Sequence, residues 1–132
     1  MKKILIITLV CMILCFTACS ARLPYDLEGT YSIEIHAYGN ESAEPVAEFV
    51  VKGEDVERIV EMFSSLKLKE MKYTEPSIRG YEFWFMDENG SNIAKIELPY
   101  GPSPWVVVGG TAYQDINGGV DVEYLTQLVD IA

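Results

Sequence analysis

Apolar and polar residues alternate along the chain from Thr30 to Tyr38, and this period of two predicts a half-buried β-strand. The odd positions from 31 to 37 are apolar, whereas the even positions carry polar side chains such as Glu34 and His36. After a polar turn the alternation resumes from Val46 to Val51. We expect this second segment to pair with the first strand.

From Glu54 the apolar period lengthens to that of an amphipathic helix. Its apolar face carries Val56, Ile59, Val60, Phe63 and Leu66. The same spacing returns near the end of the chain at Val122, Leu125, Leu128 and Val129. The pattern therefore predicts two helices.

Further strands are predicted between the helices. Residues 81–86 (YEFWFM) give the strongest strand signal, and a turn with Asn-Gly at positive φ leads to a returning strand over 91–98. A second tight hairpin is expected over 105–114 around Gly-Gly, and a lysine-rich edge strand over 68–73. The elements predict an α+β fold, with a single antiparallel sheet of about five to seven strands and two helices packed on one face.

Residues 53–62 and 119–128 share the pattern Gly-x-Asp-Val-Glu-x-aliphatic-x-x-aliphatic. One interpretation is a duplicated strand-strand-helix unit. The other is two helices that start alike, because Gly and Asp are common at helix entries. The sequence leaves both open.

Outside this pattern, the N-terminus begins with Lys2 and Lys3 and continues with an apolar run over 4–18. A short positive head before such a run is typical of a secretory signal peptide. The run is shorter than the roughly 20 residues that a membrane-spanning helix needs. The pattern predicts export of the rest of the chain.

The end of the run, Phe16-Thr17-Ala18-Cys19, resembles the lipobox of bacterial lipoproteins. The resemblance implies cleavage before Cys19 and acylation of its thiol, with 1–18 removed as the signal peptide. Residues 19–28 then form a lipidated tether and 29–132 a single α+β domain, held on the extracytoplasmic face of the cell membrane. Phe16 stands where the family usually has Leu, and a conventional cleavage after Ser20 or Ala21 is the alternative.

Composition and charge argue against several classes of partner for the chain after Cys19. No cysteine follows Cys19, so a disulfide or a thiolate metal site is not expected there. The chain has a net charge of −10, and losing Lys2 and Lys3 would leave eight basic residues against twenty acidic ones. Such a surface repels nucleic acid. We expect no nucleic-acid partner, no metal and no cofactor.

Signals for catalysis are weak. His36 is the only histidine, and none of the common nucleophile, phosphate-loop or zinc-protease motifs is present. A pair such as Glu34 and His36 offers an acid and a base, but a histidine beside a carboxylate is common on protein surfaces. We therefore expect a non-enzymatic protein, and keep a cell-wall or peptide hydrolase using His36 and a carboxylate as a weaker alternative.

Aromatic residues give the remaining functional lead. On the 81–86 strand, Trp84 and Met86 point away from Phe83 and Phe85, toward a face that two helices on the other side would leave open. Tyr100 and Trp105 belong to, or follow, a proline-rich loop. These four residues (Trp84, Met86, Tyr100 and Trp105) are the candidate recognition site, because tryptophan and tyrosine are frequent at binding hot spots.

The alternative for both tryptophans is a place in the core. On the recognition hypothesis, the protein is a membrane-anchored binding module for a protein or a small ligand. A second hypothesis is an envelope sensor or accessory subunit of a membrane protein, docked along an edge strand or the acidic helix.

Overall fold

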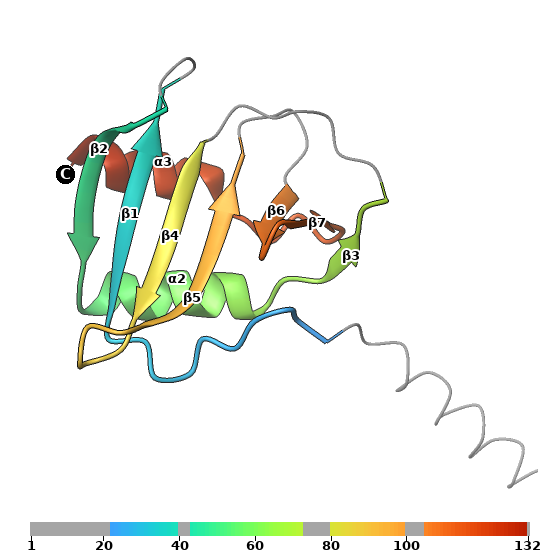
Figure 1. Ribbon diagram of the computed structural model, residues 1–132, viewed down its shortest axis with the longest axis horizontal. Helices are drawn as coiled ribbons and strands as arrows, with labels where there is room; N and C mark the ends of the chain where they lie inside the picture. The colour runs from blue at the N-terminus through green and yellow to red at the C-terminus, as the bar shows by residue number, and fades with distance from the viewer. Residues whose placement is uncertain (1–21, 40–42, 73–79, 100–104, 132) are drawn as a thin grey trace, which may run out of the picture.

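The computed structural model describes residues 22–39, 43–72, 80–99 and 105–131. In these ranges seven strands form one sheet with the order β2-β1-β4-β5-β6-β7-β3, and every pairing is antiparallel. Figure 1 shows this sheet with helices α2 and α3. The predicted α+β class and the single antiparallel sheet are confirmed. The elements are β1 (Ser32–Tyr38), β2 (Pro45–Val51), α2 (Glu54–Ser64), β3 (Leu68–Glu70), β4 (Tyr81–Met86), β5 (Asn92–Leu98), β6 (Trp105–Val108), β7 (Thr111–Asp115) and α3 (Val122–Ile131).

The alternation in β1 places its odd-numbered side chains in the core. Ile33 and Ile35 are buried, and they lie opposite Phe85 and Phe83 of β4 in the strand register. Tyr31 was expected on this buried face, and that expectation is wrong. It precedes the strand and is 60% exposed, because the core ends where the sheet ends.

Helix α2 packs on the apolar face of β4. Its buried side chains are Val56, Ile59 and Phe63, as the helical period predicts. The Phe63 ring lies 5.2 Å from that of Phe83 and 5.9 Å from that of Phe85, both edge-on. Edge-to-face contacts of this kind add to the burial of three large rings, so this triad is the centre of the core.

Helix α3 contributes Leu125 to the same core. Its N-terminus is capped by Asp121, whose Oδ1 accepts the backbone N–H of Tyr124 at 2.9 Å. The matching residue in the other copy of the shared pattern, Asp55, is already inside α2. The helix therefore begins two residues earlier in the first copy of the pattern than in the second.

The β4–β5 turn differs from its prediction at one residue. Gly90 has a φ of 78°, but no described residue other than glycine, Asn89 included, has a positive φ. Asp87 Oδ1 instead accepts the N–H groups of Asn89 and Ser91, both at 2.9 Å, so the side chain closes the turn. In the β6–β7 hairpin the predicted Gly109-Gly110 turn is confirmed, with φ values of 57° and 82°.

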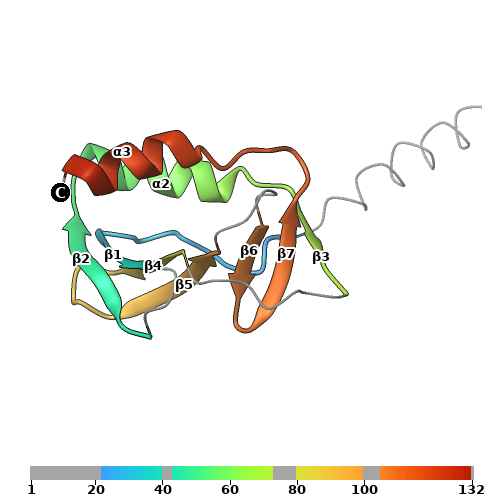
Figure 2. The same cartoon turned by 90° about the horizontal axis from the view of Figure 1, so that it is seen from above.

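The two edges of the sheet are unlike each other. β3 is three residues long, and Lys67, Lys69 and Lys72 beside it are exposed, so the predicted lysine-rich edge strand is confirmed over 68–70. β2 forms the other edge and is seven residues long. Seen from above in Figure 2, the strands β6, β7 and β3 turn away from the plane of the first four.

Candidate recognition surface

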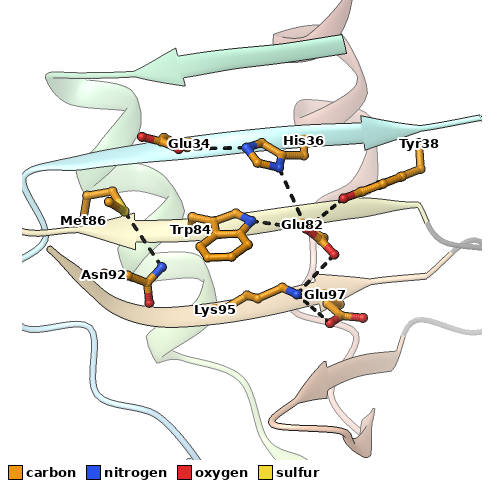
Figure 3. A network of polar contacts seen from close by, with 9 residues as sticks. All are labelled: Glu34, His36, Tyr38, Glu82, Trp84, Met86, Asn92, Lys95 and Glu97. Carbon is orange, nitrogen blue, oxygen red and sulfur yellow. Dashed lines mark hydrogen bonds and ion pairs between the residues drawn. The ribbon is translucent and has the colours of Figure 1, made fainter. Parts of the chain in front are cut away.

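One face of strands β1, β4 and β5 carries a network of polar and aromatic side chains, shown in Figure 3. These side chains stand in front of the sheet ribbons in that view. We call the network the polar cluster and this side of the sheet the polar face. The cluster consists of Glu34, His36, Tyr38, Glu82, Trp84, Met86, Asn92, Lys95 and Glu97.

Strand register brings the cluster together. Residues directly opposite each other on neighbouring antiparallel strands share a face and lie within contact distance. Two such rows cross the three strands, namely His36–Glu82–Glu97 and Glu34–Trp84–Lys95. Residues 61 positions apart in sequence, such as Glu34 and Lys95, therefore lie in the same row on the polar face.

Glu82 is the centre of the cluster. Its side chain is buried, with a residue exposure of 6%. Oε2 accepts hydrogen bonds from the Tyr38 hydroxyl at 3.0 Å and the Trp84 indole at 3.2 Å, and Oε1 lies 3.2 Å from Lys95 Nζ. Burial alone would raise the pKa of Glu82, but these hydrogen bonds and the Lys95 charge hold it below its ordinary value. Glu82 is thus an ionised buried carboxylate with three donors.

Lys95 is held between two carboxylates. Nζ lies 3.2 Å from Glu82 and 3.1 Å from Glu97, and 5.0 Å from the centre of the Trp84 ring. Burial acts to lower the pKa of Lys95, but hydrogen bonds and charge from Glu97 and Glu82 raise it overall. The ammonium therefore stays charged beside the indole, where a cation is attracted by the ring.

His36 lies between two acids, as a hydrolase would require, but at ion-pair distances. Nε2 is 3.9 Å from Glu34 Oε2, and Nδ1 is 3.9 Å from Glu82 Oε2. A carboxylate that orients a catalytic base does so through a hydrogen bond of about 2.6–3.2 Å. The imidazole instead lies beside Trp84, with ring centres 5.8 Å apart. This geometry gives a packed aromatic pair more readily than a proton relay.

The predicted recognition residues fall in three places. Trp84 and Met86 are half-buried on the polar face, so the core alternative does not hold for Trp84. Trp105 is also half-buried, but it begins β6, and β5 separates β6 from β4. Tyr100, like the lipidation residue Cys19, lies outside the described residues. The described structure thus places Trp84 and Met86, but not Trp105, in the polar cluster.

Sequence reasoning missed Glu82, Lys95 and Tyr38. One signal was present, because Glu82 is the only charged residue in the apolar strand YEFWFM. A lone carboxylate in such a strand needs donors from neighbouring strands. The sequence alone does not say which strands those are.

A smaller polar site joins the two helices. The Tyr124 hydroxyl donates to Asp55 Oδ1 at 2.7 Å, and the Arg58 guanidinium lies 3.7 Å from the centre of the Tyr124 ring. Burial and Asp55 raise the pKa of Tyr124 to about 12. A depression of about 260 Å³ beside these residues is also lined by Met62 and Gly119. Because Arg58 and Tyr124 already have partners within the chain, this site holds the helices together.

Comparison of the chain with protein-family models, curated proteins and solved structures finds no match. Within the described ranges, no group of three or more His, Cys, Asp or Glu side chains is arranged to hold a metal ion. No helix there is long and apolar enough to cross a bilayer.

Proposed function

We propose that this protein is a lipid-anchored binding module on the extracytoplasmic face of the cell membrane, and that it recognises its partner through the polar face. The observation that carries the proposal is the fixed position of Trp84. Its indole N–H is bound by Glu82 and its ring lies beside Lys95 and His36. A large half-buried aromatic side chain that is already ordered loses little entropy on binding.

The arrangement of the helices supports this role. In our proposal both helices cover the face of the sheet that carries Phe83 and Phe85, which leaves the polar face for a partner. Figure 2, in which α2 and α3 are drawn above the sheet, supports this layering. So does the contact of Phe63 with both rings.

The partners of Glu82 and Lys95 favour recognition over hydrolysis. Glu82 is saturated with donors, and Lys95 is paired twice. Such groups hold one geometry well and keep one charge state at neutral pH. His36, the base of the hydrolase hypothesis, lies 3.9 Å from each of its two carboxylates, so neither is hydrogen-bonded to it.

The membrane anchor is proposed from the lipobox-like residues before and including Cys19. Two or three acyl chains, at about 0.8 kcal/mol per buried methylene, would give stable attachment. The described chain begins at Arg22, and β1 follows ten residues later at Ser32. The polar face would therefore act close to the bilayer surface.

Anchoring is tested with the variant Cys19→Ala. We expect loss of incorporated labelled palmitate and release of the protein from the membrane fraction, because no other thiol lies at the cleavage site. Cys15→Ala is the matched control and should behave as wild type. Unchanged membrane retention of Cys19→Ala would contradict the lipid anchor.

Recognition is tested by photo-crosslinking in intact cells. A photoreactive amino acid at Met86 reports on the polar face, and the same residue at Glu57, exposed on α2, is the matched control. We expect a crosslinked species at position 86 but not at 57, and its loss on Trp84→Ala. Equal crosslinking at both positions, or no effect of Trp84→Ala, would argue against recognition through the polar face.

A second candidate is an accessory subunit of a membrane protein. It is favoured by β2, which ends the described sheet as a seven-residue strand with exposed apolar side chains.

A further inference from the structure

The β2 edge carries apolar side chains where a sheet edge is normally protected. In the described ranges no strand pairs with the outer side of β2. Val46 and Val50 on this strand are 66% and 55% exposed. Proteins usually blunt such edges with short strands or lysines, as this chain does at β3 with Lys67 and Lys69. Pro45 and the register shift beside Val46 interrupt the start of this edge, so residues 47–51 are the part of β2 that is available for pairing.

The direction of the β2 backbone follows from one hydrogen bond in β1. Tyr38 N–H donates to Gly80 O at 2.9 Å, in the register that pairs β1 with β4. In an antiparallel ladder alternate residues point to opposite neighbours, so the even-numbered residues of β1 point to β4 and the odd-numbered ones to β2. The partners of the odd-numbered residues are 47, 49 and 51. The backbone groups of Glu48 and Val50 therefore point outward. Val46 is left out of this alternation, because the register shifts between Ala37 and Tyr38 and Val46 is the extra residue of the bulge.

Glu48 and Val50 also present their side chains on the polar face. Glu48 lies opposite His36 and Val50 opposite Glu34, in the rows that continue into the polar cluster. An added strand would thus meet an acidic and an apolar side chain two positions apart. Pro45 has no N–H and Val46 lies in the bulge, so regular pairing would run from Ala47 onward.

We propose that β2 binds an extended segment of a partner protein by strand addition, and that this segment carries a lysine or arginine with an apolar residue two positions away. The basic residue lies opposite Glu48, and the apolar one opposite Val50. This deepens the proposed role in binding but uses other residues than Trp84. Strand addition takes its affinity from main-chain hydrogen bonds and its specificity from alternate side chains.

Charge argues against a second copy of this chain as the occupant. A two-fold antiparallel pairing centred on Glu48 sets Glu48 opposite Glu48. Like charges directly opposite each other destabilise a strand pair. The net charge of −10 adds repulsion between copies. The same charges attract a basic segment.

The proposal is tested with two blocked heptapeptides, Thr-Val-Thr-Lys-Thr-Val-Thr and the same sequence with Glu at its centre. The intact protein in detergent is isotope-labelled and titrated by NMR. We expect the lysine peptide to bind about fivefold more tightly than the glutamate peptide. It should slow hydrogen exchange of the amides of Glu48 and Val50. Glu48→Lys should reverse the preference. Equal affinities, or a preference that Glu48→Lys leaves unchanged, would overturn the proposal.

A second pair of variants tests the backbone. Val50→Pro removes an outward N–H, which an edge strand tolerates, so its circular dichroism should stay native while peptide binding is lost. Val50→Thr keeps the N–H and should retain binding. Binding that survives Val50→Pro would refute strand addition. A wild-type dimer in sedimentation that Val50→Pro makes monomeric would assign the edge to a second copy instead.

The two functional proposals fail separately. The peptide assay requires neither Trp84 nor a membrane, so Trp84→Ala should leave peptide affinity unchanged. Absence of peptide binding would refute strand addition at β2. Recognition through the polar face would then still be tested by crosslinking at Met86. Loss of peptide binding in Trp84→Ala would show that the edge is not an independent surface.

Discussion

Replacing Glu82 by glutamine tests whether the buried carboxylate holds the polar cluster together. The amide oxygen of glutamine can still accept from the Tyr38 hydroxyl and the Trp84 indole, now 3.0 and 3.2 Å from the carboxylate. The contact with Lys95 is lost, because an amide N–H₂ group does not accept from an ammonium. Lys95 retains Glu97 at 3.1 Å and is one-third exposed, so it is not left as a buried unpaired charge.

The magnitude follows from these contacts. A hydrogen bond to a charged group contributes about 1.5–3 kcal/mol and a neutral one about 0.5–1.5 kcal/mol, so two weakened bonds cost about 2 kcal/mol. Burying glutamine also costs less desolvation free energy than burying a carboxylate, which offsets part of this destabilisation. We expect Glu82→Gln to lower the free energy of unfolding by about 1–2 kcal/mol at pH 7. Glu97→Gln, which removes one half-buried ion pair of the same Lys95, should cost about 0.5 kcal/mol or less.

The pH dependence has a defined sign. The pKa of Glu82 in the folded protein lies below its ordinary value of 4.5. The stabilisation from its ionised form is therefore complete above about pH 4.5 and is lost as the pH falls through the folded-state pKa. Urea denaturation at pH 7 and at low pH measures the gap between wild type and Glu82→Gln, which should shrink in acid. A neutral or stabilising substitution at pH 7, or a gap that widens in acid, would refute the reasoning.

Three further variants test the core, a turn and the helix pair. Phe63→Ala should lower the free energy of unfolding by about 3–5 kcal/mol, because it opens a cavity against two aromatic rings of β4. Gly110→Ala, at a φ of 82°, should cost about 1 kcal/mol. Tyr124→Phe should cost about 1 kcal/mol by removing the bond to Asp55. The wild-type protein should lose the stability from this hydrogen bond as the pH rises from 10.0 toward the Tyr124 pKa of about 12, whereas Tyr124→Phe has no such stability to lose. Urea denaturation checks all three, and effects below about 0.3 kcal/mol would contradict them.

The order of elements was predictable because each segment carries its own period. β4 has the predicted bounds, Tyr81 to Met86, since an aromatic and apolar run between turn residues has few alternatives. The prediction for the turn between β4 and β5 was wrong at Asn89. Asn-Gly predicts two positive φ angles, but the carboxylate of Asp87 binds two backbone N–H groups and only Gly90 needs a positive φ.

The polar cluster was not predictable, because strand order is not a local property. β4 pairs with β1 and not with β3, its neighbour in sequence, and this choice brings Tyr38 to Glu82 across 44 residues. Tyr38 was correctly assigned to the polar side of β1 by alternation. Its burial could not be inferred, since it depends on the carboxylate that its hydroxyl meets.

The saturation of Glu82 limits how the polar face can bind. The Trp84 N–H and the Lys95 ammonium already have acceptors, so a ligand gains little from either donor unless it displaces the carboxylate. Displacement would leave Glu82 buried without its donors, which is costly. A partner is therefore expected to contact the ring of Trp84 and the thioether of Met86 rather than their polar neighbours. It follows that Glu82→Gln should weaken recognition only by loosening Trp84, whereas Trp84→Ala removes the contact itself.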